Sequence, residues 1–359
     1  MSVTNALMRR GTELAVTRMQ SDKIEQQLNG GVVALVAITA ILFCIAFWSI
    51  EYTYGMVIST LAAVEDTNPD IYVRITSDPD PTKPANDQED PELVAPTPLK
   101  PITSKLRTTV KHLRSRAGFW SRFRGMGMFL AYSVLRGTLF SWFPVSSYLL
   151  QFIVQSVLSV ALATWQMAWV HIVITEPSPK RFYQRIPSYK TWIKIAPAAA
   201  LQDILTAAGF FIPMTAVKLA GWLDVPGDQD VPSMVGMYRF MGASVIPAVL
   251  AFLISMPARV IFIRVAASML PEEEETIVPF DRSFGGKVIP AITGGSGKIG
   301  LMDAWTTFDW AARVRFAKVI GKTFAMQMAL GFFAALVFGA EIVLLIKTAK
   351  PADSDAPRI

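Results

Sequence analysis

The sequence predicts an all-α, multi-pass integral membrane protein with about six transmembrane helices. Its composition is the first reason: of the 359 residues, 52% are hydrophobic and only 17% are charged. In a soluble domain about a quarter of the residues carry charge. The mean hydropathy of +0.39 is the second reason. The third is that apolar runs near the roughly 20 residues needed to cross a bilayer recur along the chain.

These apolar runs define the predicted spans. Residues 31–50 contain no charged residue and form the first span, with Trp48, Tyr52 and Tyr54 near its end. Aromatic rings of this kind favour the membrane interface. Five more predicted spans follow, at residues 125–143, 146–175, 195–217, 233–264 and 323–346. A polar segment, residues 1–30, precedes them, and a polar tail, residues 348–359, follows.

The run at residues 146–175 is longer than the hydrocarbon core at 1.5 Å of rise per residue. We therefore expect a single helix there that tilts or projects into water. The stretch at residues 271–319, between the last two spans, is predicted to be a long loop. Cys44 is the only cysteine, so the chain cannot form an internal disulfide.

The composition changes twice between the first two spans. Residues 51–104 form an acidic, proline-rich loop, predicted to be mostly disordered because it has little apolar surface to bury. Residues 105–124 are predicted to form a basic amphipathic helix on a membrane surface, since apolar residues recur at three- and four-residue spacing beside a stripe of cations. The predicted contacts with anionic lipid are Lys105, Arg107, Lys111, Arg114, Arg116, Arg122 and Arg124.

This basic segment also has another interpretation. It could be a plain topogenic signal, because positive charge marks the inner side of a membrane. Nucleic acid is not expected as a partner, because the segment adjoins a span. The charges of the short loops then predict the orientation: residues 177–194 are basic and residues 224–230 are acidic. The basic loop, the basic helix and the 271–319 loop are therefore placed on the cytosolic or matrix side, and both termini on the opposite side.

Three long loops on one side divide the six spans into three span–loop–span units. Near the end of the fifth span, Pro257 is followed seven residues later by Arg264. Farther on, Gly297 and Leu301 form a Gly-x-x-x-Leu element. Both the plan and these positions resemble the mitochondrial carrier family. The resemblance implies a bundle of three repeats, each with a long loop that carries a surface helix, and solute transport as the activity.

The same stretch also departs from the carrier pattern. Arg259 stands where the family has an acidic residue, and Phe262 stands where it has a basic one. In the second unit, His171 lies near the position that corresponds to Arg264, without a proline seven residues before it. These departures put the charge-pair gate of the family in doubt.

Ionisable residues inside the predicted spans are the strongest local hints of a site. They are Arg136, Asp203, Arg239 and Glu341. A charge at the centre of a membrane helix costs about 2.5–3.5 kcal/mol on insertion scales, so such residues pair, reach the surface or face the interior of a bundle. Two interpretations stay open: a polar path or solute site, and a buried pair that holds the helices in register.

No catalytic constellation is visible, and the sequence predicts neither a cofactor nor a metal site. The two histidines, His112 and His171, lie far apart in the sequence. The first hypothesis is a transport protein of an organellar membrane, either the mitochondrial inner membrane or an endomembrane, similar to a degenerate carrier. The second is a non-transporting scaffold or adaptor that recruits lipids or proteins through its basic helix and acidic loop. A membrane enzyme ranks last.

Overall fold

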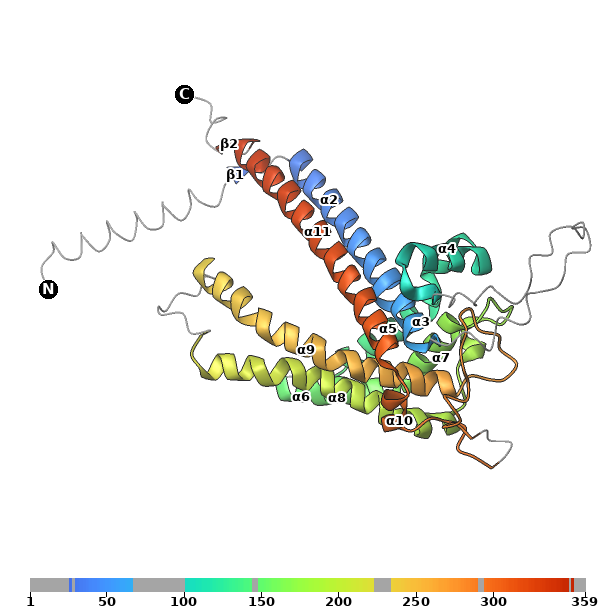
Figure 1. Cartoon of the computed structure of the whole chain (residues 1–359). Coiled ribbons are helices and arrows are strands. Elements are labelled where there is room, and N and C mark those ends of the chain that lie inside the picture. Colours follow the sequence, from blue (N-terminus) through green and yellow to red (C-terminus); the bar gives the residue numbers. More distant parts are fainter. Residues whose placement is uncertain are drawn as a thin grey trace, which may run out of the picture. The chain divides into compact units, whose positions relative to one another are not determined.

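The computed structural model describes residues 26–27, 30–66, 101–143, 148–222, 234–289, 294–348 and 350–351 (Figure 1). These residues are almost entirely helical, which confirms the all-α prediction. Two short strands, β1 (Gln26–Gln27) and β2 (Lys350–Pro351), pair antiparallel. The chain divides into two compact units, which we describe separately. Unit 1 comprises residues 1–51 and 322–359, and unit 2 comprises residues 52–321.

Unit 1 contains α2 (Gly30–Ile50) and the larger part of α11 (Trp310–Thr348). The ring of Phe43 packs against Phe333 and Phe338, with ring centroids 5.9 and 5.7 Å apart. The Thr39 hydroxyl donates a hydrogen bond of 2.7 Å to Glu341 Oε1. This contact satisfies one oxygen of a carboxyl group that lies within an otherwise apolar helix pair.

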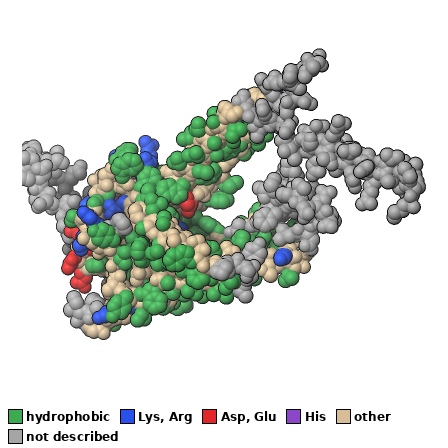
Figure 2. Space-filling view, turned by 180° about the vertical axis from the view of Figure 1, so that it is seen from behind, with side chains coloured by type: hydrophobic (Ala, Val, Ile, Leu, Met, Phe, Trp, Pro, Cys, Tyr) green, Lys and Arg blue, Asp and Glu red, His purple; other side chains and the backbone are tan. Residues whose placement is uncertain are grey.

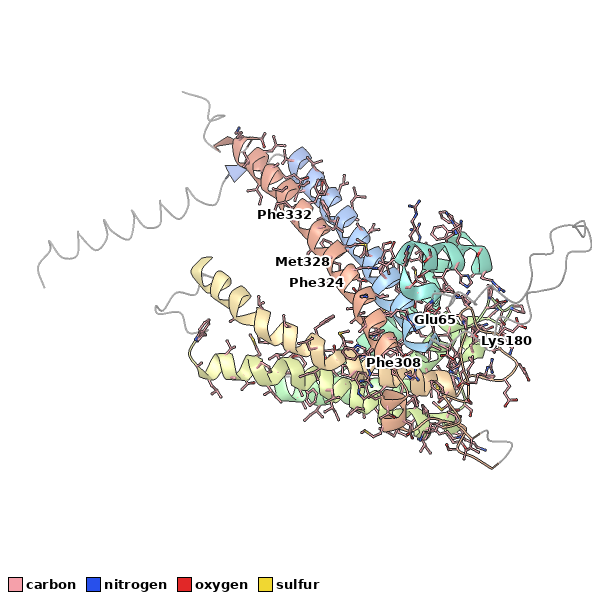
Figure 3. The ribbon with its side chains drawn as sticks, viewed as in Figure 1. Glu65, Lys180, Phe308, Phe324, Met328 and Phe332 are labelled. Carbon is pink, nitrogen blue, oxygen red and sulfur yellow. The ribbon has the colours of Figure 1, made fainter. Side chains whose placement is uncertain are left out.

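Apolar side chains cover most of the remaining surface of this pair. Phe324, Met328 and Phe332 follow one another at four-residue spacing along α11, and each is more than half exposed (Figure 3). A helix that is hydrophobic on every side is typical of a lipid environment or a large core.

Unit 2 holds the remaining helices. Its longer ones are α4 (Leu106–Ala117), α5 (Met126–Ser141), α6 (Tyr148–Ala161), α7 (Ala163–Ile174), α8 (Tyr189–Leu219) and α9 (Met234–Ser268). The short ones are η1 (Glu51–Ile58), α3 (Ser59–Val64), η4 (Ile102–Ser104), η5 (Phe119–Phe123), η6 (Phe182–Arg185) and α10 (Leu301–Thr306).

The core of unit 2 lies where α3, α7 and α9 pack together. Leu61, Met167 and Ile263 are almost completely buried there. The long helices α8 and α9 lie along each other, and Gly209 of α8 makes their close approach possible. A Cβ at that position would lie only 2.9 Å from the backbone of Ala251 in α9.

Four helical stretches are long and apolar enough to cross a membrane: Gly30–Val64, Tyr189–Leu219, Val249–Ser268 and Trp310–Leu345. A fifth would result if α6 and α7 formed one broken span, since they meet at 56°. The prediction of a single helix over residues 146–175 is therefore wrong. Around Leu162 the N–H of Trp165 bonds to the carbonyl three residues back, at 2.9 Å, and this tight turn redirects the chain.

Several predicted boundaries also need correction. The first helical stretch continues to Val64, so residues 51–64 do not belong to a disordered loop. Two of its hydroxyls are satisfied within the helix, because Ser59 and Thr60 bond back to the carbonyls of Gly55 and Met56. Residues 67–100 of the predicted loop lie outside the described residues.

The loop predicted at residues 271–319 is shorter than expected, because α11 already begins at Trp310. The basic helix is shorter as well. It ends at Ala117, where Gly118 adopts a φ of 78°, and a 3-10 turn follows. A left-handed residue just after the last turn is a common way to end a helix.

Candidate functional site at the converging helix ends

The C-terminal ends of α3, α7 and α9 meet in unit 2 (Figure 1). The last turn of every α-helix leaves carbonyl groups without an intrahelical partner, and these groups carry a partial negative charge. Three such ends close together therefore require hydrogen-bond donors, and cations suit them best. Arg124, His171, Arg264 and Arg315 supply the donors; together with Glu65 we call them the helix-end cluster.

Arg264 connects α9 to α3. Its Nη1 donates to the carbonyl of Ala63 in the last turn of α3 at 3.1 Å, and its Nη2 donates to Thr307 Oγ1 at 2.9 Å. The guanidinium also lies 4.7 Å from the ring centroid of Phe284 and 5.3 Å from that of Phe308. Only 7% of Arg264 is exposed, so these contacts hold a charge inside the protein.

His171 connects α7 to α9. Its Nε2 lies 2.8 Å from the carbonyl oxygen of Ala266, in the last turn of α9. Because a carbonyl only accepts, this nitrogen carries the proton. The histidine is 6% exposed and thus lies inside the core.

Arg124 closes the end of α7. Its Nη2 donates to the carbonyl of Ile172 at 2.9 Å, and also to the carbonyl of Thr175. Burial and the positive charge of nearby Arg185 lower the pKa of Arg124 to about 10. Arg124 therefore caps the end of α7.

Glu65 and Arg315 complete the cluster beyond the end of α3. The Glu65 carboxylate accepts hydrogen bonds from the backbone of Ile102 and from the backbone and hydroxyl of Thr103. Arg315 donates to the carbonyl of Glu65 at 2.7 Å, and its Nε lies 3.8 Å from Glu65 Oε2. Both residues are at least nine-tenths buried. Loss of one partner would strand the other charge in the core.

A cavity of about 430 Å³ lies beside this cluster. The lining includes the carboxylates of Asp66, Asp281 and Asp309, which surround the Arg264 charge. Partial burial raises the pKa of Asp281. Hydrogen bonds from the Ser283 hydroxyl and from the backbone of Gly285 and Ser283, together with the Arg264 charge, lower this pKa by more than burial raises it. The net pKa of Asp281 therefore lies below its usual value.

Phe284, another residue of this lining, has a φ of 48°. A bulky side chain rarely adopts such a left-handed backbone conformation, and doing so costs free energy. The conformation brings its ring over the Arg264 guanidinium. Figure 3 labels Glu65 and Phe308, two other residues of this region.

The structure places the carrier-like positions in different elements of unit 2. Arg264 belongs to the helix-end cluster, whereas Pro257 lies within α9, seven residues before it. Gly297 occupies a turn with a φ of 62°, and its N–H bonds to the carbonyl of Ile289 at 3.1 Å. Leu301 is the first residue of α10.

The structure also places the ionisable residues of the predicted spans in different helices. Asp203 of α8 forms a hydrogen bond with Ser159 of α6 and interacts electrostatically with Arg136 of α5. Oδ2 of Asp203 is buried without a hydrogen-bond partner. Glu341 belongs to unit 1, where it contacts Thr39. Arg239 lies in α9, and its side chain is outside the described part of the structure.

The basic helix α4 exposes its cations but not its apolar stripe. Leu113 is fully buried, and Leu106, Val110 and Ala117 pack against the core of unit 2. The exposed cations are Lys105, Arg107, Lys111, Arg114 and Arg116, while Arg122 is half-buried. Figure 2 shows most of the visible charged side chains gathered at this end, and mainly hydrophobic side chains along the helices.

Two of these cations have partners that keep them close to the protein. Arg114 lies over the ring of Phe119, 4.4 Å from its centroid, and Arg116 forms an ion pair with Glu176 at 3.1 Å. Because Leu113 is buried and Leu106, Val110 and Ala117 are half-buried against the core, α4 presents mainly charge to its surroundings.

Sequence reasoning missed the roles of His171, Arg124, Arg315 and Glu65. Arg124, His171 and Arg315 each donate to a backbone carbonyl, and such a contact leaves no motif in the sequence. The available signal was a basic residue close to the end of a predicted helix. Among the described residues, no group of three or more His, Cys, Asp or Glu could hold a metal ion.

A double-mutant cycle tests whether Arg136 and Asp203 form a structural pair. If they do, Arg136→Leu and Asp203→Leu should each lower the free energy of unfolding by about 3–5 kcal/mol, because one buried charge loses its partner. The combination of the two changes should restore most of the loss. Thermal unfolding in detergent measures all three variants, and single variants as stable as the wild type would rule out the pair.

Comparison with known protein families, with curated proteins and with solved structures finds no match to this chain. Any functional argument therefore rests on the geometry described above.

Proposed function

We propose that the chain is a six-span membrane protein that carries a small solute across an organellar membrane. In this proposal, the converging ends of α3, α7 and α9 close the solute path on the side of the long loops. The four apolar helical stretches and the broken pair α6–α7 provide five of the six spans. The sixth would be α5, whose 16 residues extend about 24 Å and require a locally thinner bilayer.

The order of the elements supports three units of similar plan. A long helical stretch, a short helix and a second membrane helix follow one another three times along the chain. The middle helices are α4, η6 and α10, and the first stretch of the second unit is the broken pair α6–α7. This order agrees with the span–loop–span repeat of the mitochondrial carrier family, which the sequence resembles.

The observation that carries the proposal is the helix-end cluster. A bundle that only needed stability would fill this place with apolar side chains, since a buried charge is costly. Here Arg264 and His171 instead join the ends of three helices through bonds to backbone carbonyls. Each such bond contributes about 1–3 kcal/mol at most, so the ends can separate and close again.

The closure that we propose differs chemically from a gate of acid–base pairs. Arg259 occupies the position where the carrier pattern has an acid. In its place, the carbonyl of Ala63 accepts from Arg264 and that of Ala266 accepts from His171. Helix-end carbonyls therefore supply part of the negative charge, beside the carboxylates around Arg264 and the Glu65–Arg315 pair.

One observation favours the second function, a scaffold that recruits lipid. The cations Lys105, Arg107 and Lys111 are exposed on α4, at the end of unit 2 where charged side chains gather (Figure 2). Anionic lipid head groups would attract them at about 1 kcal/mol for each basic residue close to the surface. This role is compatible with transport and becomes the main function if no solute path exists.

Cysteine labelling tests the six-span topology. In a Cys44→Ala background, single cysteines replace Ser188, Ser283 or Asp228. Ser188 and Ser283 are exposed, and Asp228 lies in the acidic loop outside the described residues. A membrane-impermeant maleimide should label the first two from one side and the third from the other. Labelling of all three from the same side would refute the topology.

Ion leakage tests the closure. Proteoliposomes that contain the Arg264→Ala/His171→Ala double variant should release trapped chloride faster than wild-type proteoliposomes. Loss of the charge-assisted bond of Arg264, worth about 1.5–3 kcal/mol, together with the neutral bond of His171, raises the open fraction roughly tenfold or more. An ion-selective electrode follows the efflux. Lys111→Ala is the matched control, because Lys111 is exposed and outside the cluster.

Folding of the double variant is checked by size-exclusion chromatography, and Arg264→Lys offers a milder change. Folded variants that hold chloride as tightly as the wild type would show that the cluster does not close a path. The scaffold function would then be the better explanation.

Lipid dependence tests the role of α4. The wild type should unfold at a higher temperature in nanodiscs with anionic lipid than in neutral ones, and added salt should reduce the difference because it screens the attraction. The Lys105→Gln/Arg107→Gln/Lys111→Gln variant should lose most of that difference. Lys218→Gln, near the end of α8, serves as the control. Equal unfolding temperatures in both lipids would contradict the electrostatic attraction.

A further inference from the structure

A second cavity, of about 260 Å³, lies between the end of α7, residues 180–187, the start of α8 and the end of α9. It shares no lining residue with the cavity beside Arg264. Its polar lining groups include Lys180, Gln184, Arg185, Thr191 and Glu274. Nothing in the proposed transport function requires this cavity.

The charges in this cavity do not balance. Glu274 faces two cations at once: its Oε1 lies 3.5 Å from Lys180 Nζ, and its Oε2 lies 3.4 Å from Arg185 Nη2. Charge-assisted hydrogen bonds are usually about 2.7–2.9 Å long, so both contacts are loose. One carboxylate therefore holds two cations weakly and leaves a net positive charge.

Arg185 is the buried member of this pair of cations. Its side chain is 8% exposed, and its Nη1 donates to Thr175 Oγ1 at 3.3 Å. Its Nε is buried without a hydrogen-bond partner. A buried donor without an acceptor costs free energy, and a guanidinium offers its donors in a rigid fork that matches the oxygens of a phosphate.

The other groups complete a set of donors. Lys180 lies at the exposed side of the cavity, with half of its side chain accessible (Figure 3). Gln184 and Thr191 add an amide and a hydroxyl to the lining. His171, on the wall opposite, is already engaged with the carbonyl of Ala266.

We propose that this cavity binds a phosphate group, carried either by a small solute or by a lipid head group. Arg185 is its buried anchor, and Lys180 binds it from the exposed side. Glu274 competes with the phosphate for both cations and so sets the affinity. The cavity has room for a small organic group beside the phosphate.

Titration with inorganic phosphate tests the site on the full-length protein in detergent. Phosphate should raise the unfolding temperature in a saturable way, whereas chloride at the same ionic strength should not. Lys180→Gln should weaken phosphate binding roughly tenfold or more, because a charged hydrogen bond is lost. Glu274→Gln should strengthen it, because the competing carboxylate is gone. Lys218→Gln, in the last turn of α8 and far along that helix from the cavity, should leave it unchanged.

The opposite signs of the first two variants separate binding from a loss of structure, which would weaken binding in both. Glycerol phosphate and nanodiscs with phosphatidic acid distinguish the two sources of the phosphate group. Displacement of phosphate by the first identifies a soluble ligand, and displacement only by the second identifies a lipid. No response to inorganic phosphate or phosphatidic acid would overturn the proposal, as would weaker phosphate binding by Glu274→Gln.

Discussion

The convergence of three helix C-termini is the constraint on which unit 2 depends. Each end brings carbonyl groups without intrahelical partners and a partial negative charge, so close packing of α3, α7 and α9 is unfavourable unless donors lie between them. Arg264 and His171 reach across from one helix to the carbonyls of the next, and Arg124 closes the end of α7. The positions of these three residues therefore follow from the need to neutralise the helix ends.

The same constraint explains the unusual surroundings of the Arg264 charge. A guanidinium that is 7% exposed needs more than two hydrogen bonds, and the rings of Phe284 and Phe308 surround it. The left-handed backbone of Phe284 is strained, and the contact between ring and cation offsets that strain. The carboxylates of Asp66, Asp281 and Asp309 then contribute negative charge around it.

Helix type and approximate position could be predicted from the sequence, because apolar composition over about 20 residues is a local property. The break at Leu162 could not, since it depends on a turn within an unbroken apolar run. Residues 51–64 were misassigned because Glu51, Ser59 and Thr60 look polar, although the two hydroxyls are satisfied within the helix. At the site, Arg264 was identified from its spacing to Pro257. The role of His171 could not be predicted, because its partner is a backbone carbonyl 95 positions away.

The close approach at Gly209 distinguishes the contact between α8 and α9 from the other helix contacts of unit 2. Because the backbones of α8 and α9 nearly touch there, these two helices pack closely against each other. Side chains, by contrast, join α9 to α3 and to α7, through the bonds of Arg264 and His171 and through the buried core around Leu61, Met167 and Ile263. Separation of α9 from α3 and α7 would therefore exchange hydrogen bonds and expose that core, whereas separation of α8 from α9 would break a contact between backbones. The α8–α9 pair is thus held by backbone packing, and its attachment to α3 and α7 relies on side chains.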